Sequence, residues 1–324
     1  MKARIHPPTP ANLRRLAAVL RRGGMVAIPT ETVYGLAANA LDARACRAIF
    51  RAKGRPANDP LIVHVLDLAP AEQLAEFNPA ARKLARRFWP GPLTLVLPKK
   101  ACVPAIVTSG GDTVALRAPA HPLARRLLKL AGIPLAAPSA NLFGYISPTS
   151  AAHVADGLGR RIKHVLDGGA CAVGVESTVL DVTHPEKPRI LRPGAITAAT
   201  LEKFLGVAVR PVRRRNSGQA MPAPGMLERH YSPRTLLRIR HPGGRLPPDV
   251  AGIFLRQPAG AAGPNVYWLS DHGTLEEIAR NLYRVLRRAD QSRHREIWIE
   301  ALPADAGGIT AAINDRLKRA AARR

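Results

Sequence analysis

The sequence predicts an α/β protein with a large first domain and a small second one. Segments with helical periodicity alternate with short apolar runs over residues 10–206, and several apolar runs follow one another directly after residue 90. A polar, arginine-rich stretch interrupts this pattern at residues 210–234, and a shorter set of helices and strands follows it. We therefore expect a mixed, twisted sheet covered by helices, and not a purely parallel βαβ ladder.

The helices are marked by their end signals. Residues 10–22 carry leucines at helical spacing, and Gly23-Gly24 end the pattern. Asp42 is expected to cap a second helix that ends at Gly54, because an aspartate side chain can accept from the first backbone amides of a helix. Further starts are predicted at Asn78-Pro79, Ser147-Pro148 and Thr197, with ends at Trp89-Pro90-Gly91-Pro92 after the first and at Gly206 after the last.

Strands are expected where short apolar runs lie between turn signals. In the large domain these runs are residues 25–28, 61–66, 93–97, 114–116, 134–137, 179–181 and 189–191. A polar loop, residues 30–35, follows the first of them.

The domain boundaries are predicted at 1–209 for the large domain, 210–234 for a linker and 235–324 for the small domain. In the small domain, Thr274 and Glu277 have the spacing of a capping box before an amphipathic helix. Strands are expected at residues 252–255, 266–269 and 297–299, and a last helix at 309–317. This is the pattern of a small βαβ-type unit.

Composition excludes several classes of protein. No apolar run approaches the roughly 20 residues that a membrane span needs, and the first eight residues lack the apolar core of a signal peptide. The three cysteines lie far apart and form no CxxC pair, which argues against a zinc site or a disulfide framework. We expect a cytoplasmic protein with no protein-bound metal.

The formal net charge of +26 raises the question of a nucleic-acid partner. The excess is +15 over residues 1–209 and +11 over residues 210–324, so it is not gathered in one segment. Aromatic residues make up only 4% of the chain, although readers of single-stranded RNA rely on aromatic stacking. A solvated basic surface is the plainer interpretation, and direct tRNA binding is expected to be weak at most.

Common phosphate and hydrolase motifs are absent from the sequence. It contains no GxxxxGK[ST], no GxGxxG after a strand, no HExxH and no GxSxG. A phosphate compound would therefore have to be held by another arrangement.

The first such arrangement is Lys53-Gly54-Arg55-Pro56 at the end of the second helix. Two cations leave the helix together there, and an arginine can bind phosphate oxygens bidentately. The structural alternative is a common helix end, in which basic residues answer the helix dipole and the glycine is the C-cap.

Small polar residues provide further candidates. Ser139 and Asn141 directly follow a predicted strand, where open α/β sheets bind ligands, although the same residues also suit a plain turn. Ser147 opens a predicted helix whose free amides would attract phosphate, although it is equally a good cap. The loop at 29–35 and the segment at 174–181, with Arg192 after it, are weak signals when taken singly.

Taken together, these segments resemble the YrdC-like threonylcarbamoyl-AMP synthases. The match runs in order through residues 29–35, 53–64, 90–94, 137–149, 167–181 and 190–197, and it covers essentially residues 10–209. The segment 224–233, which contains His230-Tyr231-Ser232-Pro233, looks like the linker of the two-domain members. The resemblance implies a YrdC-like twisted mixed sheet followed by a small Rossmann-like domain.

The resemblance also implies a reaction. Such a nucleotidyltransferase converts L-threonine, bicarbonate and ATP with Mg²⁺ to threonylcarbamoyl-AMP and pyrophosphate, and a tRNA threonylcarbamoyl transferase complex uses the product to form N6-threonylcarbamoyladenosine. Lys53 and Arg55 would be catalytic. The residues that would hold threonine are Thr32, His64, Arg117, Ala137 and Ser177. Those that would hold ATP are Arg55, Asp59, Thr113, Ser139, Asn141, Ser147, Arg192 and Tyr231, the last reaching in from a linker that acts as a lid.

Elementary chemistry agrees with this set of residues. Attack of a carbamate oxygen on the α-phosphorus requires in-line placement and cationic stabilisation of the leaving group more than a covalent nucleophile. The sequence departs from the family pattern at Asn58-Asp59-Pro60, where Asp-Asn-Pro is usual, and at Phe143, where serine is frequent. Two alternatives stay open, namely a carbamoyl-adenylate-forming enzyme of the carbamoyltransferase type and an RNA-binding module.

Overall fold

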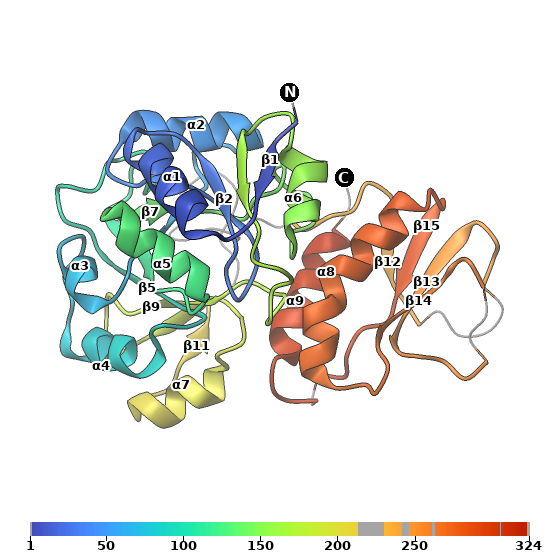
Figure 1. The fold of residues 1–324 in the computed structure, drawn as a ribbon. Coiled ribbons are helices and arrows are strands. Elements are labelled where there is room, and N and C mark those ends of the chain that lie inside the picture. The colour runs from blue at the N-terminus through green and yellow to red at the C-terminus, as the bar shows by residue number, and fades with distance from the viewer. Residues whose placement is uncertain (1, 213–229, 242–245, 261–262, 305, 323–324) are drawn as a thin grey trace.

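The computed structural model describes residues 2–212, 230–241, 246–260, 263–304 and 306–322. The chain forms a large unit and a small unit, each around its own sheet (Figure 1). In the described part of the chain, no helix is long and apolar enough to cross a lipid bilayer.

The large sheet is mixed, as the sequence predicts. Its eleven strands lie in the order β1-β8-β2-β3-β7-β4-β6-β5-β9-β10-β11. It contains both parallel pairs, such as β4 and β6, and antiparallel pairs, such as β5 and β6. The strands are β1 Arg4–His6, β2 Val26–Ile28, β3 Gly35–Asn39, β4 Ile62–His64, β5 Leu93–Pro98, β6 Thr113–Arg117, β7 Leu135–Ala136, β8 His164–Leu166, β9 Thr178–Asp181, β10 Arg189–Arg192 and β11 Arg210–Pro211.

Helices cover both faces of this sheet. One apolar cluster joins α1 and α5 to one face of β2, β3 and β7, and a larger cluster joins α2, α4 and α6 to the other face. The neighbouring part of the first face, over β4 and β6, is where the site described below lies. The helices are α1 Pro10–Arg21, α2 Ala43–Lys53, α3 Leu68–Glu72, α4 Pro79–Phe88, α5 Pro122–Ala131, α6 Ala151–Leu158 and α7 Ala198–Leu205.

The small unit has a four-stranded parallel sheet in the order β12-β15-β13-β14. Its strands are β12 Leu236–Ile239, β13 Val250–Arg256, β14 Val266–Ser270 and β15 Glu296–Ile299, and its helices are α8 Leu275–Gln291 and α9 Thr310–Ala320. Both helices lie between the two sheets (Figure 1). They therefore face the large unit, and their outward side chains reach it.

Most of the predicted caps are confirmed. Asp42 accepts from the amides of Arg44 and Ala45, and α2 ends at Gly54 in the left-handed conformation with φ 64°. Asn78 and Thr197 cap α4 and α7. The prediction for Ser147 is wrong, because α6 begins at Ala151 with Ser150 as its cap.

The capping box of the small unit is formed only in part. Thr274 stands at the N-cap of α8, but its side chain makes no capping hydrogen bond. Glu277 instead accepts from the hydroxyl of Ser270, at 2.5 Å. Seven elements are not predicted from the sequence, namely β1, β3, β8, β11, β12, α3 and α5. Strand β11 extends the large sheet two residues beyond the predicted boundary at residue 209.

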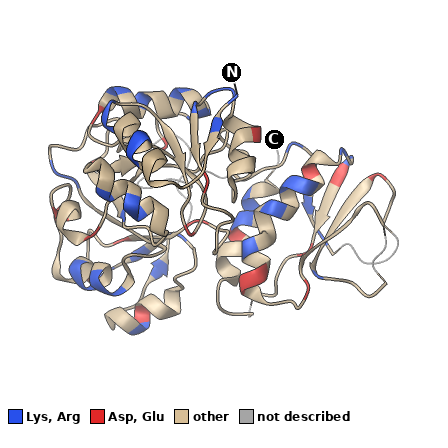
Figure 2. Cartoon of the chain, viewed as in Figure 1, with Lys and Arg blue, Asp and Glu red and all other residues tan. Residues whose placement is uncertain are grey.

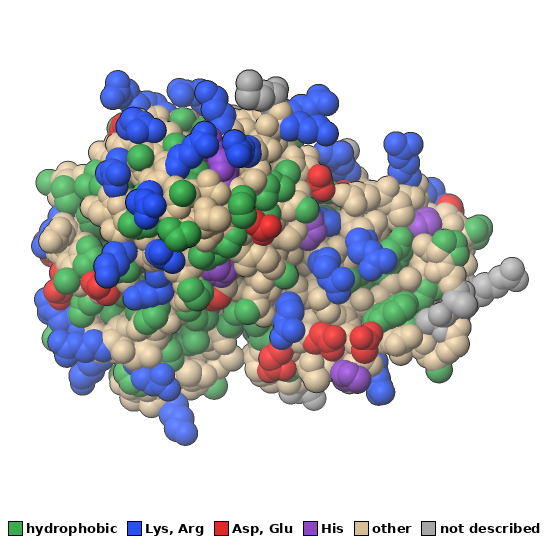
Figure 3. All heavy atoms as spheres, viewed as in Figure 1, with side chains coloured by type: hydrophobic (Ala, Val, Ile, Leu, Met, Phe, Trp, Pro, Cys, Tyr) green, Lys and Arg blue, Asp and Glu red, His purple; other side chains and the backbone are tan. Residues whose placement is uncertain are grey.

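Lysine and arginine residues are spread over the elements of the large unit and along α8 (Figure 2). The space-filling view shows them scattered over the visible face, with acidic side chains gathered low on the small unit (Figure 3). On this face the basic charge is dispersed, as its distribution along the sequence indicates.

Candidate active site

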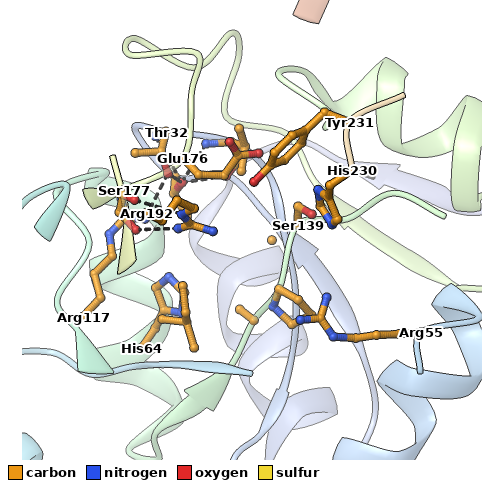
Figure 4. Close-up of a pocket in the computed structure, with 16 residues that line it drawn as sticks. Thr32, Arg55, His64, Arg117, Ser139, Glu176, Ser177, Arg192, His230 and Tyr231 are labelled. Atoms are coloured by element: carbon orange, nitrogen blue, oxygen red, sulfur yellow. Dashed lines mark hydrogen bonds between the residues drawn. The ribbon is translucent and has the colours of Figure 1, made fainter. Parts of the chain in front are cut away.

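The candidate site is a cavity over the face of β4 and β6 (Figure 4). His64 and Arg117 are register partners on these two strands, so their side chains point to the same face and into the cavity. The cavity has a volume of about 40 Å³. Its lining comprises Thr30, Thr32, Val33, Gly35, Arg55, Ile62, His64, Arg117, Ala137, Pro138, Ser139, Glu176, Ser177, Arg192, His230 and Tyr231.

Arg117 is held in place by three acceptors. Its Nε donates to the carbonyl of Gly91 at 3.1 Å, and its terminal nitrogens donate to Thr32 Oγ1 at 3.0 Å and to Glu31 Oε1 at 2.6 Å. Both ionised side chains are almost fully buried. Burial raises the pKa of Glu31, but Arg117 outweighs it and leaves that pKa below its ordinary value. The other carboxylate oxygen of Glu31 is buried with no hydrogen-bond partner among the described residues.

Ser177 and Arg192 lie side by side on the next part of the wall. Arg192 donates from Nε to the Ser177 carbonyl and from Nη2 to the Ser177 hydroxyl, both at 3.1 Å. The same hydroxyl is 2.8 Å from Thr94 Oγ1 on β5. A cation and a hydroxyl are thus fixed at one point of the cavity (Figure 4).

Lys53 joins the two motifs that the sequence singled out. Its ammonium group donates to the carbonyls of Ser139 and Asn141 at 2.5 and 2.6 Å. It is 2% exposed, and burial together with the charge of Arg55 lowers the pKa of Lys53 well below its ordinary value. The Lys53–Arg55 element and the Ser139–Asn141 element are therefore physically bound to each other.

Arg55 lines the cavity, and Asp59 anchors it from behind. The guanidinium Nη2 lies 2.9 Å from Asp59 Oδ1, and it also donates to the carbonyl of Pro60 at 2.7 Å. Asp59 is fully buried and does not line the cavity. Its negative charge therefore meets a guanidinium rather than the space where phosphates would lie.

His64 is present as a neutral ring. Burial, followed by the nearby charge of Arg117, lowers the pKa of His64 to about 3. Its Nδ1 is buried without a hydrogen-bond partner in the described part of the chain. A ring nitrogen inside the cavity is thus available to a ligand as an acceptor or, in the other tautomer, as a donor.

Tyr231 and His230 complete the cavity from outside the large sheet. Tyr231 has a positive φ of 65° and stacks on Tyr283 of α8, with ring centroids 5.7 Å apart. Its hydroxyl is buried with no hydrogen-bond partner in the parts that the structure covers. Burial raises the pKa of Tyr231, so the phenol remains neutral.

The structure brings most of the predicted site residues together. Nine line the cavity, namely Thr32, Arg55, His64, Arg117, Ala137, Ser139, Ser177, Arg192 and Tyr231. Five do not, namely Lys53, Asp59, Thr113, Asn141 and Ser147. Lys53 and Asp59 contact residues of the cavity wall. Thr113 stands at the start of β6 and Arg117 at its end.

Three charged or titratable residues were missed by the sequence analysis. Glu31, Glu176 and His230 all belong to segments that the sequence singles out, so the segments are visible but these residues receive no role. Glu176 lines the cavity, and its partners come from distant parts of the chain. No local pattern announces such contacts.

No group of three or more histidine, cysteine or acidic side chains gathers as a metal site in the residues that the structure covers. Glu31, Asp59 and Glu176 are each paired with an arginine. A divalent cation would therefore meet carboxylates that are already neutralised.

Two family models match consecutive parts of the chain. The Sua5/YciO/YrdC model, described as "Telomere recombination", matches residues 18–194, and the model "Threonylcarbamoyl-AMP synthase, C-terminal domain" matches residues 196–322. The chain is 42% identical to the threonylcarbamoyl-AMP synthase of Pyrococcus abyssi, over 95% of this chain and 93% of the relative. It is 41% identical to that of Bacillus subtilis, over 95% and 92%.

Solved structures agree with these matches. The crystal structure of P. abyssi Sua5 complexed with L-threonine superimposes with a TM-score of 0.88 at 39% identity, and the match covers 98% of both chains. Escherichia coli YciO shares the fold of the large unit, with a TM-score of 0.53 at 22% identity over 59% of this chain.

Proposed function

This chain belongs to the threonylcarbamoyl-AMP synthase family, and we propose that its central cavity joins L-threonine, bicarbonate and ATP with the residue roles that follow. The observation that carries this proposal is that Arg117, held by Thr32 and Glu31, lines the same cavity as Arg55 and Arg192. One end suits a small amino acid, and the other suits phosphate.

Threonine would bind at the Arg117 end. The three hydrogen bonds of Arg117 to Gly91, Thr32 and Glu31 use three of its five guanidinium N–H groups, which leaves donors for the substrate carboxylate. His64 and Ser177 lie on the same wall and would contact the amine and hydroxyl, beside Thr32 and Ala137. Glu31 lies behind this wall and holds the Arg117 guanidinium in place.

ATP would bind at the other end. Arg55, Ser139 and Tyr231 line it, Arg192 lies beside Ser177 between the two ends, and Lys53 holds the backbone of Ser139 from behind the wall. Asp59 would act through Arg55, while Thr113, Asn141 and Ser147 would need to turn toward the nucleotide. The cavity has a volume of about 40 Å³, room for only a few water molecules, so the segment of Tyr231 would move to admit ATP.

The reaction balances without a covalent enzyme intermediate. The threonine amine combines with bicarbonate to give a carbamate and water. A carbamate oxygen then attacks the α-phosphorus, the bond to the β-phosphate breaks, and pyrophosphate leaves with the displaced electron pair. Arg55 and Arg192 would stabilise the charge on the leaving group, which is the main demand of this step, and Lys53 would act by holding Ser139 and Asn141 in position.

Mg²⁺ is expected to accompany ATP on its phosphates. Glu176, which lines the cavity, is paired with Arg316, and Glu31 behind the wall is paired with Arg117, so the protein offers no dedicated cation cage among its described residues. The product would pass to a tRNA threonylcarbamoyl transferase complex, and we expect this transfer to occur in the cytoplasm.

Product identification tests the proposal. The purified chain is incubated with ATP, L-threonine and ¹³C-bicarbonate, and the products are analysed by mass spectrometry. Labelled threonylcarbamoyl-AMP and pyrophosphate are expected, and both should depend on threonine. Equal pyrophosphate release without threonine would refute the proposal. Release stimulated by carbamoyl phosphate alone would favour the carbamoyl-adenylate alternative.

A further inference from the structure

Glu176 is the point where the small unit contacts the cavity wall. Arg316 of α9 donates from Nε to Glu176 Oε2 at 2.9 Å, and Tyr283 of α8 donates its hydroxyl to the same oxygen at 2.9 Å. Ser147 of the large unit donates to Oε1 at 2.6 Å. Three donors from three separate segments thus converge on one carboxylate.

This contact is buried on both sides. The Arg316 side chain has no exposed surface and that of Glu176 is 7% exposed, so solvent screens their interaction little. Arg316 also pairs with Asp315, and its guanidinium lies 5.3 Å from the ring centre of Tyr231. Burial raises the pKa of Glu176, but Arg316, Arg192 and the Ser147 hydrogen bond outweigh it and keep the group ionised.

The position of Glu176 creates an electrostatic problem for a nucleotide site. Its side chain lines the same cavity as Arg55, Arg192 and Tyr231, where the triphosphate would lie. An ionised carboxylate there repels phosphate unless a cation is paired with it. Arg316 is that cation, and it comes from the small unit (Figure 1).

We propose that Arg316 is a positioning residue that neutralises Glu176 so that the cavity accepts ATP, and that the small unit is required for this reason. The role rests on ATP being the substrate. Tyr283 assists by orienting the same carboxylate. The fixed carboxylate also accepts from the hydroxyl of Ser147, and Ser177 is the next residue in the chain. It therefore helps to position two residues that are predicted to contact the substrates.

The alternative is that the ion pair only attaches one unit to the other. The two interpretations differ in what happens when both charges are removed. If the ion pair only attaches the units, the double variant Arg316→Met/Glu176→Gln should bind ATP no more tightly than Arg316→Met alone. If Arg316 neutralises Glu176, the double variant should bind ATP more tightly than Arg316→Met, because no unpaired charge remains.

Equilibrium binding of ATP by calorimetry measures this directly and requires no turnover. Arg316→Met should weaken ATP binding about tenfold or more, because it leaves an uncompensated buried charge. Adding Glu176→Gln should restore binding to within about threefold of the Glu176→Gln single variant, because the two substitutions share one interaction. Lys318→Met, on the exposed side of α9, is the matched control and should bind ATP normally.

Glu176→Gln by itself provides a second test if Arg316→Met does not fold. It should bind ATP as tightly as the unaltered chain or more tightly, and weaker binding would overturn the proposal. Unchanged ATP binding by a folded Arg316→Met variant would overturn it as well, as would equal weakening of ATP and threonine binding. Failure of the unaltered chain to make threonylcarbamoyl-AMP, with ATP still bound, would refute the reaction and leave this inference standing.

Discussion

Arg117 and Glu31 form an ion pair with 2.6 Å between Nη2 and Oε1, and Arg117 lines the cavity that is proposed to receive threonine. The arginine is thus oriented before any substrate arrives, and its planar group is fixed by a carboxylate, a hydroxyl and a carbonyl. Such preorganisation lowers the entropy lost when a ligand carboxylate binds.

Arg117→Lys should raise the KM for threonine by about ten- to hundredfold, because an ammonium group cannot replace a planar donor with several fixed bonds. Initial rates at saturating ATP measure this effect. The KM for ATP should change far less, since Arg117 lies at the other end of the cavity. Arg125→Lys on α5, whose guanidinium donates to the carbonyl of Leu66, is the control. Similar increases in both KM values would argue against the threonine assignment.

Asp59→Ala should destabilise the fold by about 3–5 kcal/mol, because it leaves the Arg55 guanidinium buried without its carboxylate. It should also weaken ATP binding by releasing Arg55 from its position. Urea unfolding and ATP titration measure the two effects, with Asp59→Asn as the milder variant. Tighter ATP binding by the alanine variant would show that Asp59 repels the phosphates instead of holding Arg55.

Tyr231→Phe removes the hydroxyl of this residue and keeps its ring, so it tests the two groups separately. The ring contact with Tyr283 should survive, so the unfolding midpoint should change little. If the buried hydroxyl bonds to ATP, the KM for ATP should rise by about five- to tenfold, the value of one hydrogen bond. A normal KM in a stable variant would show that the hydroxyl makes no contact with the nucleotide.

The native state should lose stability as the pH falls below 6.5. His64 has a pKa of about 3 in the folded chain against 6.5 in the unfolded one, so only the unfolded chain takes up its proton in this window. The contribution of His64 is complete above pH 6.5 and is lost progressively toward pH 3.

His64→Gln should therefore flatten the pH dependence of the unfolding free energy between pH 6.5 and 4 by up to about 1.4 kcal/mol per pH unit. Urea unfolding at several pH values measures the slope. His184→Gln, at an exposed turn, serves as the control and should keep the original slope. An unchanged slope in the His64 variant would contradict the burial of a neutral ring.

Local rules predicted the parts of the fold that depend on neighbouring residues. Asp42, Asn78 and Thr197 cap their helices because each cap is a contact across two or three positions. The Lys53–Arg55 motif can be predicted because a helix end that carries two cations is a pattern of only about five neighbouring residues. Helix α5 was missed although Pro122 stands at its first position and Gly132 follows its end, so that signal was available.

Other features depend on contacts that the sequence does not display. Strand β3 consists of Gly35-Leu36-Ala37-Ala38-Asn39, whose small residues have little strand propensity, and its pairing with β2 and β7 decides its conformation. Ser147 has the local pattern of a cap, but its hydroxyl is used by Glu176. The burial of the Glu176 carboxylate in turn depends on its pairing with Arg316, which is 140 positions away in the chain.

The insertion of α8 and α9 between the two sheets has a consequence for the order of events during synthesis. A ribosome delivers residues 1–209 well before residues 310–320, and the large unit can collapse while α9 is still inside the exit tunnel. Until α9 emerges, the nascent cavity carries an unneutralised acid and should take up little nucleotide. The growing chain would then be unable to consume ATP, and the enzyme would become active only after α9 has emerged and packed against the large unit.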